Sequence, residues 1–297
     1  MPTCKLSIVF LNFNRIAETR YTVDYLRNIL VGREDIEVIA IDNGSGDGTG
    51  VYLESQADFL TAIRLADNLG IAGYNEGFER AVGEYIFVLD DDSHPADIQT
   101  LNRLIAKLDA SPEIGILACG IDDKFGQPVQ SWHLPKKLAA GPSMSFIGCG
   151  FAIRRQLFSE CGWYPAKFFL YQNEVEVAMQ VRMRGYAIQF APDCRVVHRV
   201  APGNRGGWRQ VFFATRNSLW LIRSHFAGWN RYYLLVSRIV IGLIRATQLR
   251  QWAAYLRGLR EGLFANVTFQ PLPKRLLADF QPFREQNSLW HRVTKRT

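Results

Sequence analysis

An alternation of short apolar runs and amphipathic segments fills the first 110 residues, and it constrains the fold more than any other feature. The apolar runs have the length of buried strands, and the segments between them have helical periodicity. Repeated units of this kind predict an α/β fold, with a mostly parallel sheet covered by helices on both faces. The strands expected along the chain are 5–11, 36–41, 61–65, 85–89, 114–118, 145–153 and 187–197. The helices expected between them are 16–30, 71–82, 95–110 and 173–184.

Polar side chains follow three of the expected strands, at 12–15, 42–47 and 90–92. In parallel sheets, ligands bind beyond the carboxyl ends of the strands, where such side chains meet. The third group is an acidic triplet, Asp90-Asp91-Asp92, directly after five apolar residues. Carboxylates at this spacing can face a cleft together and hold Mg²⁺ or Mn²⁺ on the phosphates of a substrate. The alternative is a solvated turn or a helix cap.

Three segments carry a family resemblance: SIVFLNFNR, VIAIDNGSGDGT and NLGIAGYNEGFERAVGEYIFVLDDDSHP. In order and spacing they resemble the nucleotide-binding half of GT-A glycosyltransferases, specifically the inverting family 2 and its rhamnosyltransferase-like members. The resemblance implies a GT-A catalytic domain over residues 1–198, with a nucleotide-sugar half (1–110) and an acceptor half (111–198). It also implies a UDP- or dTDP-linked sugar as donor.

For the nucleotide, the resemblance implies that Asn12, Arg15 and Asp42 contact the nucleobase and ribose. It places Asn68 and Asn75, in the N-x-G-x-A-x-x-N segment, beside the sugar nucleotide. Judged from propensity alone, Asp42 could instead stabilise its turn, and the two asparagines could be caps or turn residues.

For the metal, the resemblance makes Asp90 and Asp92 the pair that holds Mg²⁺ or Mn²⁺, with Asp92 as the direct ligand. Asp90 and Asp91 also belong to the sugar-nucleotide site, where Asp90 touches ribose or metal-bound water. His198, at the end of a strand, completes the metal or diphosphate site in some relatives; a structural histidine is the alternative.

The stretch FFLYQNEVEVAMQVRMRGYAIQFAPDCRVVH resembles the part of the family that carries the general base. Asn173 and Glu174 stand where the family has an E-D pair, so the resemblance assigns the base to Glu174, with Glu176 in reserve. Both glutamates also begin a helix, where acids are favoured by the macrodipole. Trp132 and His133, on an expected loop, are candidates to line the acceptor pocket, although a tryptophan is also a common packing residue.

Charge divides the chain. Residues 1–198 contain 18 Lys and Arg against 25 Asp and Glu, whereas residues 199–297 contain 17 against 3. Helices expected at 209–226, 230–250 and 252–264 mix arginine with aromatic and aliphatic residues, which suits an anionic membrane surface. Packing on the catalytic domain, a homodimer interface and nucleic-acid binding are alternatives, but no nucleic-acid motif is present. No uninterrupted apolar stretch has the length of a spanning helix.

Together these features predict metal-dependent, inverting transfer of a sugar from a nucleoside diphosphate to a hydroxyl of a glycan or lipid-linked glycan. The alternatives are a sugar-phosphate nucleotidyltransferase and a non-catalytic module that binds nucleotide sugars or glycans. The five cysteines are scattered without metal-site spacing, and the N-terminus lacks the order of a signal peptide. We therefore expect a cytoplasmic enzyme attached to the inner face of the membrane.

Overall fold

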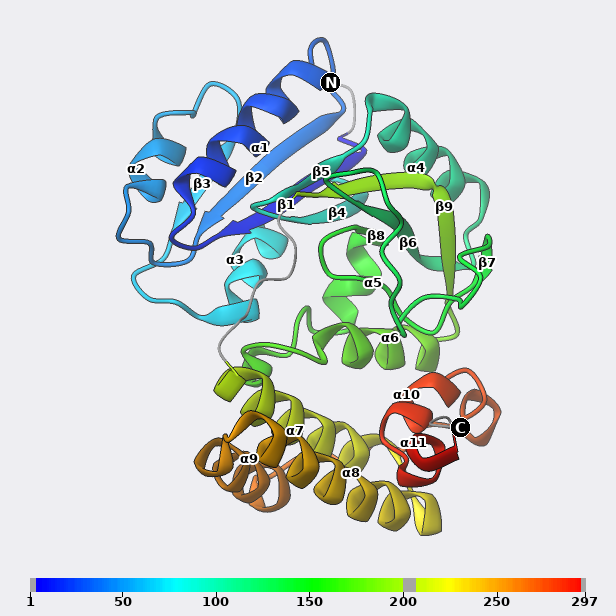
Figure 1. The fold of residues 1–297 in the computed structure, drawn as a ribbon. Helices are drawn as coiled ribbons and strands as arrows, with labels where there is room; N and C mark the ends of the chain where they lie inside the picture. Colours follow the sequence, from blue (N-terminus) through cyan, green and yellow to red (C-terminus); the bar gives the residue numbers. More distant parts are fainter. Residues whose placement is uncertain (1–3, 200–206, 295–297) are drawn as a thin grey trace.

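The computed structural model describes residues 4–199 and 207–294, with a curled sheet unit above a layer of helices (Figure 1). The strands are β1 (Leu6–Asn12), β2 (Ile36–Asp42), β3 (Thr61–Arg64), β4 (Tyr85–Asp90), β5 (Ser93–Pro95), β6 (Ile114–Asp123), β7 (Gly141–Pro142), β8 (Phe151–Arg154) and β9 (Ala187–His198). The helices of the sheet unit are α1 (Ile16–Ile29), α2 (Thr49–Glu54), α3 (Gly73–Arg80), α4 (Ile98–Ala110), α5 (Arg155–Glu160) and α6 (Asn173–Met183). The later helices are α7 (Gly207–His225), α8 (Gly228–Leu249), α9 (Trp252–Phe264), α10 (Gln281–Gln286) and α11 (Leu289–Thr294).

The described strands form one sheet in the order β3-β2-β1-β4-β8-β6-β9-β5, with β7 paired to β9. Strands β1 to β4 are parallel, as the sequence predicts. Strand β8 runs antiparallel to both β4 and β6, and β9 runs parallel to β6. The sheet is therefore mixed, and its parallel half ends in the polar clusters at 12–15, 42–47 and 90–92.

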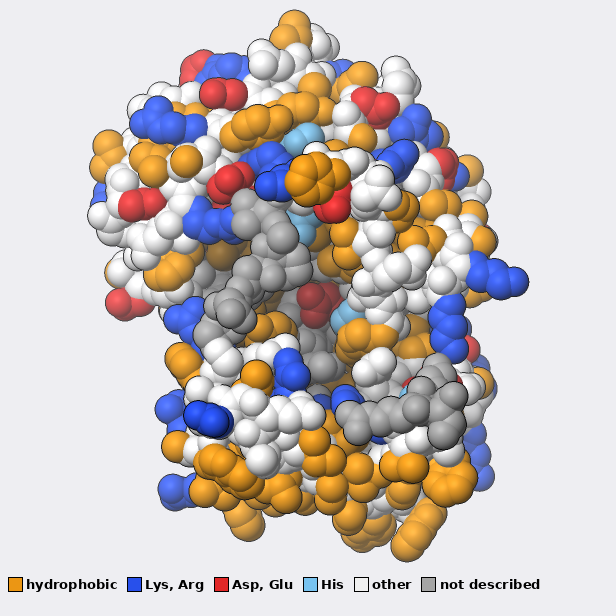
Figure 2. Space-filling view, viewed as in Figure 1, with side chains coloured by type: hydrophobic (Ala, Val, Ile, Leu, Met, Phe, Trp, Pro, Cys, Tyr) orange, Lys and Arg blue, Asp and Glu red, His pale blue; other side chains and the backbone are white. Residues whose placement is uncertain are grey.

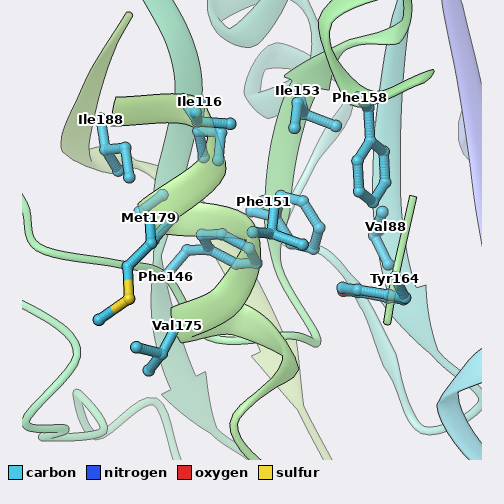
Figure 3. Packing of buried hydrophobic residues seen from close by; sticks show 14 of the residues in the cluster. Val88, Ile116, Phe146, Phe151, Ile153, Phe158, Tyr164, Val175, Met179 and Ile188 are labelled. Carbon is cyan, nitrogen blue, oxygen red and sulfur yellow. The ribbon is translucent and has the colours of Figure 1, made fainter. Parts of the chain in front are cut away.

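Successive side chains of the central strands enter two different cores, because strand residues alternate between the faces of a sheet. Ile8 and Phe10 of β1 pack in the core beneath α1 and α4. Val9 packs in the opposite core, which α3, α5 and α6 cover. Figure 3 shows part of this second core, where Phe151 and Met179 lie among other large apolar side chains.

Two predicted elements differ from the structure. The segment 145–153 forms a strand only from Phe151, because the residues before it make turns. The helix expected from Pro95 begins at Ile98, where the Asp97 side chain accepts a hydrogen bond from the Thr100 amide. Residues Ser93–Pro95 instead form β5, which pairs with the end of β9.

The expected C-terminal helices are present, and α7 lies between α6 and the outer pair α8 and α9 (Figure 1). Residues of α7, α8 and α10 share the core that covers α6, among them Leu221, Leu234 and Phe283. A domain boundary at residue 198 stays a prediction. By length and composition, α8 is the one described helix able to cross a membrane, although its apolar run contains arginine.

Candidate active site

The acidic triplet lies where β4 ends and turns into β5. Asp91 and Asp92 are almost fully buried, with 5% and 2% of their surface exposed. Within the turn, the Asp90 amide donates to Ser93 Oγ, and that hydroxyl donates to the Cys149 carbonyl. Because β5 pairs with β9 in a register that sets Ser93 opposite His198, the histidine comes to the acids from more than 100 residues away. The sequence expectation that these residues meet is consistent with this pairing.

Arg15 and His198 balance the buried carboxylates. Arg15 Nη1 lies 2.8 Å from Asp91 Oδ1, and Nη2 lies 2.7 Å from Asp92 Oδ2. His198 Nε2 lies 3.1 Å from the other Asp92 oxygen, Oδ1. Burial opposes ionisation of Asp92, but His198 and Arg15 outweigh it and lower its pKa. Burial and the neighbouring Asp92 and Asp90 raise the pKa of Asp91 to about 8 despite Arg15.

A divalent cation fits the donor set at this turn. Ligand atoms of Asp90, Cys149 and His198 lie within 4.8 Å of one another. Burial raises the pKa of the Cys149 thiol well above its usual value, so this sulfur stays protonated and is a poor ligand. The remaining donors are the Asp90 carboxylate, Asp92 Oδ1 and the His198 imidazole. The two carboxylates are the ligands that suit Mn²⁺ or Mg²⁺.

Tyr74 of α3 orients Asp90 and was not among the predicted site residues. Its buried hydroxyl contacts Asp90 Oδ1 at 2.8 Å and the Leu89 carbonyl at 2.7 Å. Burial and the charge of Asp90 raise the pKa of this phenol well above its usual value, so it remains a donor. Its place inside the N-x-G-x-A-x-x-N segment was a signal that could have identified it.

The polar turn after β2 forms the second part of the site. Asp42 is 1% exposed, and its Oδ1 accepts a hydrogen bond from the Ser45 amide. The Asp42 side chain therefore stabilises the turn, while Arg64 Nε lies 4.0 Å from its second oxygen. Asn43 joins this turn to Asn68 through a 3.1 Å hydrogen bond between their amides.

Three predicted nucleotide contacts have other partners in the structure. Asn12 has no exposed surface, and its amide binds the Ile41 carbonyl and the Thr19 hydroxyl, so it is not available to a ligand. The Arg15 guanidinium forms ion pairs with Asp91 and Asp92. Asn75 donates to the Tyr164 carbonyl and accepts from the Tyr164 amide, which joins α3 to the segment before α6.

Glu174 is the second residue of α6 and lies beside the loop 148–150. A Cβ atom on Gly148 would sit 3.0 Å from Glu174 Oε1, so this carboxylate lies close against the Gly148 backbone. Cys149 is the next residue in the chain, and the negative charges of Asp90, Asp92 and Glu174 help to raise the pKa of its thiol. The predicted base and the predicted metal ligands therefore flank one loop. Figure 2 shows acidic side chains in the hollow between the sheet unit and the helices.

Glu176 has a structural partner. Its Oε2 lies 2.7 Å from His225 Nε2 on α7, and Gln180 donates to Oε1. Burial opposes both charges, but their mutual attraction outweighs it, lowering the pKa of Glu176 and raising that of His225. This buried ion pair joins α6 to α7, so the structure does not support Glu176 as the reserve base.

A strained segment precedes α6, and sequence reasoning did not find it. Phe169, Tyr171 and Gln172 have φ angles of 61°, 67° and 68°, which are costly for residues other than glycine. Asn217 Nδ2, from α7, donates to the carbonyls of residues 168, 170 and 171. Arg216 donates to the carbonyls of residues 167 and 168. The C-terminal region thus fixes the backbone that leads into Glu174.

The same segment contacts the nucleotide half. The Phe169 carbonyl accepts a hydrogen bond from the Ile71 amide at 2.8 Å. Gly70, with a φ of 61°, lies against Phe169 so closely that any Cβ would clash with its carbonyl. Residues 167–171 therefore contact both the predicted donor half and α7.

Trp132 and His133 lie on the loop before β7. Burial lowers the pKa of His133 to about 4, and its ring lies against Trp132. Trp132 also lines a cavity of about 800 Å³ between this loop, the start of β9 and α10. Other residues lining it include Gln130, Gln189 and Gln286. A side chain that touches both core and cavity is compatible with the packing role and with the acceptor role.

Comparison with solved structures defines the class of this fold. A mannosyltransferase from Pyrobaculum calidifontis, PcManGT, solved with GDP-Man and Mn²⁺, gives a TM-score of 0.61 at 18% identity, over 88% of this chain and 87% of that one. S. aureus TarS 1–349 with UDP-GlcNAc gives 0.63 at 15%, over 97% and 92%. GalNAc-T7, solved with UDP, GalNAc and Mn²⁺, gives 0.59 at 17%, over 83% and 54%. The fold is the GT-A fold of nucleotide-sugar glycosyltransferases.

Sequence comparison identifies the family. The glycosyl transferase family 2 profile matches residues 7–176, and the chain belongs to this family. An uncharacterized protein of Haemophilus influenzae is 28% identical over 173 residues, which is 54% of this chain and 92% of that protein. The uncharacterized glycosyltransferase YfnE of Bacillus subtilis is 43% identical over 77 residues, 25% of this chain and 18% of YfnE. The protein is a glycosyltransferase, which decides against the nucleotidyltransferase and the non-catalytic binding module.

Proposed function

We propose that this glycosyltransferase moves a sugar, with inversion, from a nucleoside diphosphate to a hydroxyl of a glycan or lipid-linked glycan in cell-surface polysaccharide synthesis. The supporting observation is the arrangement around the loop 148–150, with Asp90, Asp92 and His198 on one side and Glu174 on the other. This arrangement has a place for a leaving diphosphate and a base for the incoming hydroxyl.

The leaving-group side uses the buried acids. A divalent cation held by Asp90, Asp92 and His198 would supply positive charge to the departing diphosphate. Arg15 keeps Asp92 ionised and oriented through Oδ2, which leaves Oδ1 directed toward His198. Tyr74 fixes Asp90 from the other side. Mn²⁺ accompanies the nucleotide ligands in two of the similar structures, which supports the choice of ion.

The acceptor side uses Glu174. Inversion is a single displacement, in which the acceptor hydroxyl attacks the anomeric carbon opposite the diphosphate. The Glu174 carboxylate would accept the hydroxyl proton, a contribution of roughly 10²–10⁴ in rate. We propose that the acceptor lies along Gly148 and toward Trp132, because both residues belong to the predicted acceptor half and Trp132 lines a cavity there.

The donor is proposed from the family resemblance and the neighbours. A UDP- or dTDP-linked sugar, with rhamnose among the candidates, follows from the resemblance. The TarS complex with UDP-GlcNAc and the PcManGT complex with GDP-Man support a nucleotide sugar in general.

The five cysteines are free thiols, which supports the proposal of a cytoplasmic location.

The test is donor turnover with Mn²⁺ over a panel of UDP-, dTDP- and GDP-sugars, using the wild type, Glu174→Gln and the exposed control Glu79→Gln. We expect one donor to be consumed, and Glu174→Gln to lower turnover by roughly 10²–10⁴ without weakening nucleotide binding. The Glu79 variant should match the wild type. A Glu174→Gln variant with wild-type transfer would refute the proposed base, and turnover of no donor would refute the proposed reaction.

A further inference from the structure

Helices α8 and α9 present apolar side chains on the side of the molecule away from the sheet. We call this surface the outer helical face. Figure 2 shows hydrophobic side chains gathered along the lower edge of the molecule, where Figure 1 places these helices. Its most exposed large members are Trp229, Tyr232, Val236, Leu243, Ile244, Trp252, Leu256 and Phe264.

On α8 these residues form a single stripe. Trp229, Tyr232, Val236 and Leu243 follow one another at intervals of three, four and seven residues, so they lie on one side of the helix. Trp229 is 81% exposed and Val236 is 59% exposed. The opposite side, which includes Leu234, is buried. The stripe is long, continuous and free of charged residues.

Arginine accompanies the apolar stripe. Residues 228–264 contain six arginines and one acid, Glu261. That acid is already paired with Arg216 and Arg257. Arg260, on α9, follows Leu256 by four residues and shares its exposed side. The face therefore combines apolar and aromatic side chains with the positive charge of Arg260, within a region that has five more arginines than acids.

We propose that the outer helical face docks on an anionic lipid bilayer, with α8 and α9 lying in the plane of the headgroups. Tryptophan and tyrosine favour the membrane interface, and arginine binds lipid phosphates there. A helix with an apolar face and a basic flank lies in this plane rather than across the bilayer. Arg231, Arg238 and Arg245 recur every seven residues on the opposite side of α8, where Arg231 lies over the Phe269 ring and Arg245 donates to Gln210. If α8 crossed a bilayer, these three charges would lie at membrane depth, where charge is costly.

Docking in this orientation fixes the distance between the bilayer and the proposed active site. Helix α7 lies between α6, whose second residue is Glu174, and the outer pair (Figure 1). Two helix diameters, roughly 20 Å, therefore separate the bilayer from the proposed base. An acceptor carried on a membrane lipid would reach the hollow with a short polar spacer, which agrees with the proposed acceptor class.

The experiment measures co-sedimentation of the full chain with vesicles of phosphatidylcholine alone or with 30 mol% phosphatidylglycerol. We compare the wild type with Trp229→Ser/Phe264→Ser, whose side chains are 81% and 80% exposed. The matched control is Phe125→Ser, 76% exposed on the loop after β6. We expect salt-sensitive binding to the anionic vesicles only, a loss of about tenfold in the double variant, and no change in the control. Donor turnover should be unchanged in all three.

Four results would overturn the proposal. The wild type could fail to bind anionic vesicles, or the double variant could bind them as well as the control does. Light scattering could show that the wild type is a dimer and the double variant a monomer, with no vesicle binding by either. The outer helical face would then bind a second copy of the chain. Protein that resists alkaline extraction from vesicles would indicate that α8 crosses the bilayer.

Discussion

Asn217→Ala tests whether the C-terminal region positions the proposed base. The Asn217 side chain has no exposed surface, and its amide donates hydrogen bonds to the carbonyls of residues 168, 170 and 171. Removing it takes the Asn217 hydrogen bonds from the carbonyls of residues 170 and 171, whereas the carbonyl of residue 168 keeps its bond from Arg216; the loss costs about 2–4 kcal/mol of unfolding free energy in total. In a chain of this size that loss lowers Tm by roughly 3–6 °C.

The same variant should also affect catalysis. Without Asn217, the positive φ angles at Phe169, Tyr171 and Gln172 lose the contacts that hold them, and each costs roughly 1–3 kcal/mol. The segment then relaxes, and Glu174 moves with it. A shift of about 1 Å at a catalytic group costs on the order of 10²-fold in rate. We expect kcat to fall by roughly 10–100-fold, with little change in the affinity for the nucleotide.

Asn287→Ala is the matched control. Asn287 is 2% exposed, and its amide donates one hydrogen bond, to the Phe283 carbonyl, away from the acids. Its loss should lower Tm by a few degrees at most, about 1–2 kcal/mol, without changing kcat. The assays are thermal unfolding and steady-state transfer. If both variants lose stability and both keep wild-type kcat, Asn217 only stabilises the fold, and the positioning role is wrong.

Three further predictions concern other parts of the molecule. The raised pKa of His225 stabilises the fold below the unfolded pKa of histidine, and this stabilisation is lost as the pH rises through the folded pKa. The lowered pKa of Glu176 stabilises the fold above the unfolded pKa of glutamate, and this stabilisation is lost as the pH falls through the folded pKa. Thermal unfolding should therefore show a wild-type advantage over Glu176→Gln that is largest near pH 5–6 and shrinks toward pH 9, and an advantage that grows with pH would contradict the pairing. Trp132→Ala should raise KM for the acceptor with donor KM unchanged, whereas unchanged acceptor kinetics would leave Trp132 as packing. Asn75→Ala should lower Tm by roughly 3–6 °C through loss of two backbone hydrogen bonds and leave UDP binding, measured by calorimetry, as in the wild type; a tenfold loss of UDP affinity would restore its predicted donor contact.

The parallel half of the sheet follows from local patterns. Its strands are buried on both faces, so their apolar runs are nearly continuous and their ends are marked by polar turns. The acid triplet was placed correctly at the end of β4 for the same reason. The short β5 was missed, because three residues containing a proline carry no strand pattern and depend on pairing with β9.

Roles that depend on distant contacts were harder to predict. Asn12 and Arg15 are polar residues at a strand end, which is where ligand contacts are expected. Their side chains instead bind Thr19 and the acids, and only the packed structure shows this. Asn217 gave no signal, since its partners are backbone carbonyls in a segment whose positive φ angles do not follow from residue type.

The most direct test of the account is anomalous diffraction at the manganese edge, from crystals grown with Mn²⁺ and UDP. The account predicts one strong peak within coordination distance of Asp90 or Asp92 and adjoining the UDP diphosphate, and no such peak in crystals of Asp92→Asn. A clear nucleotide diphosphate with no manganese beside these carboxylates would contradict it.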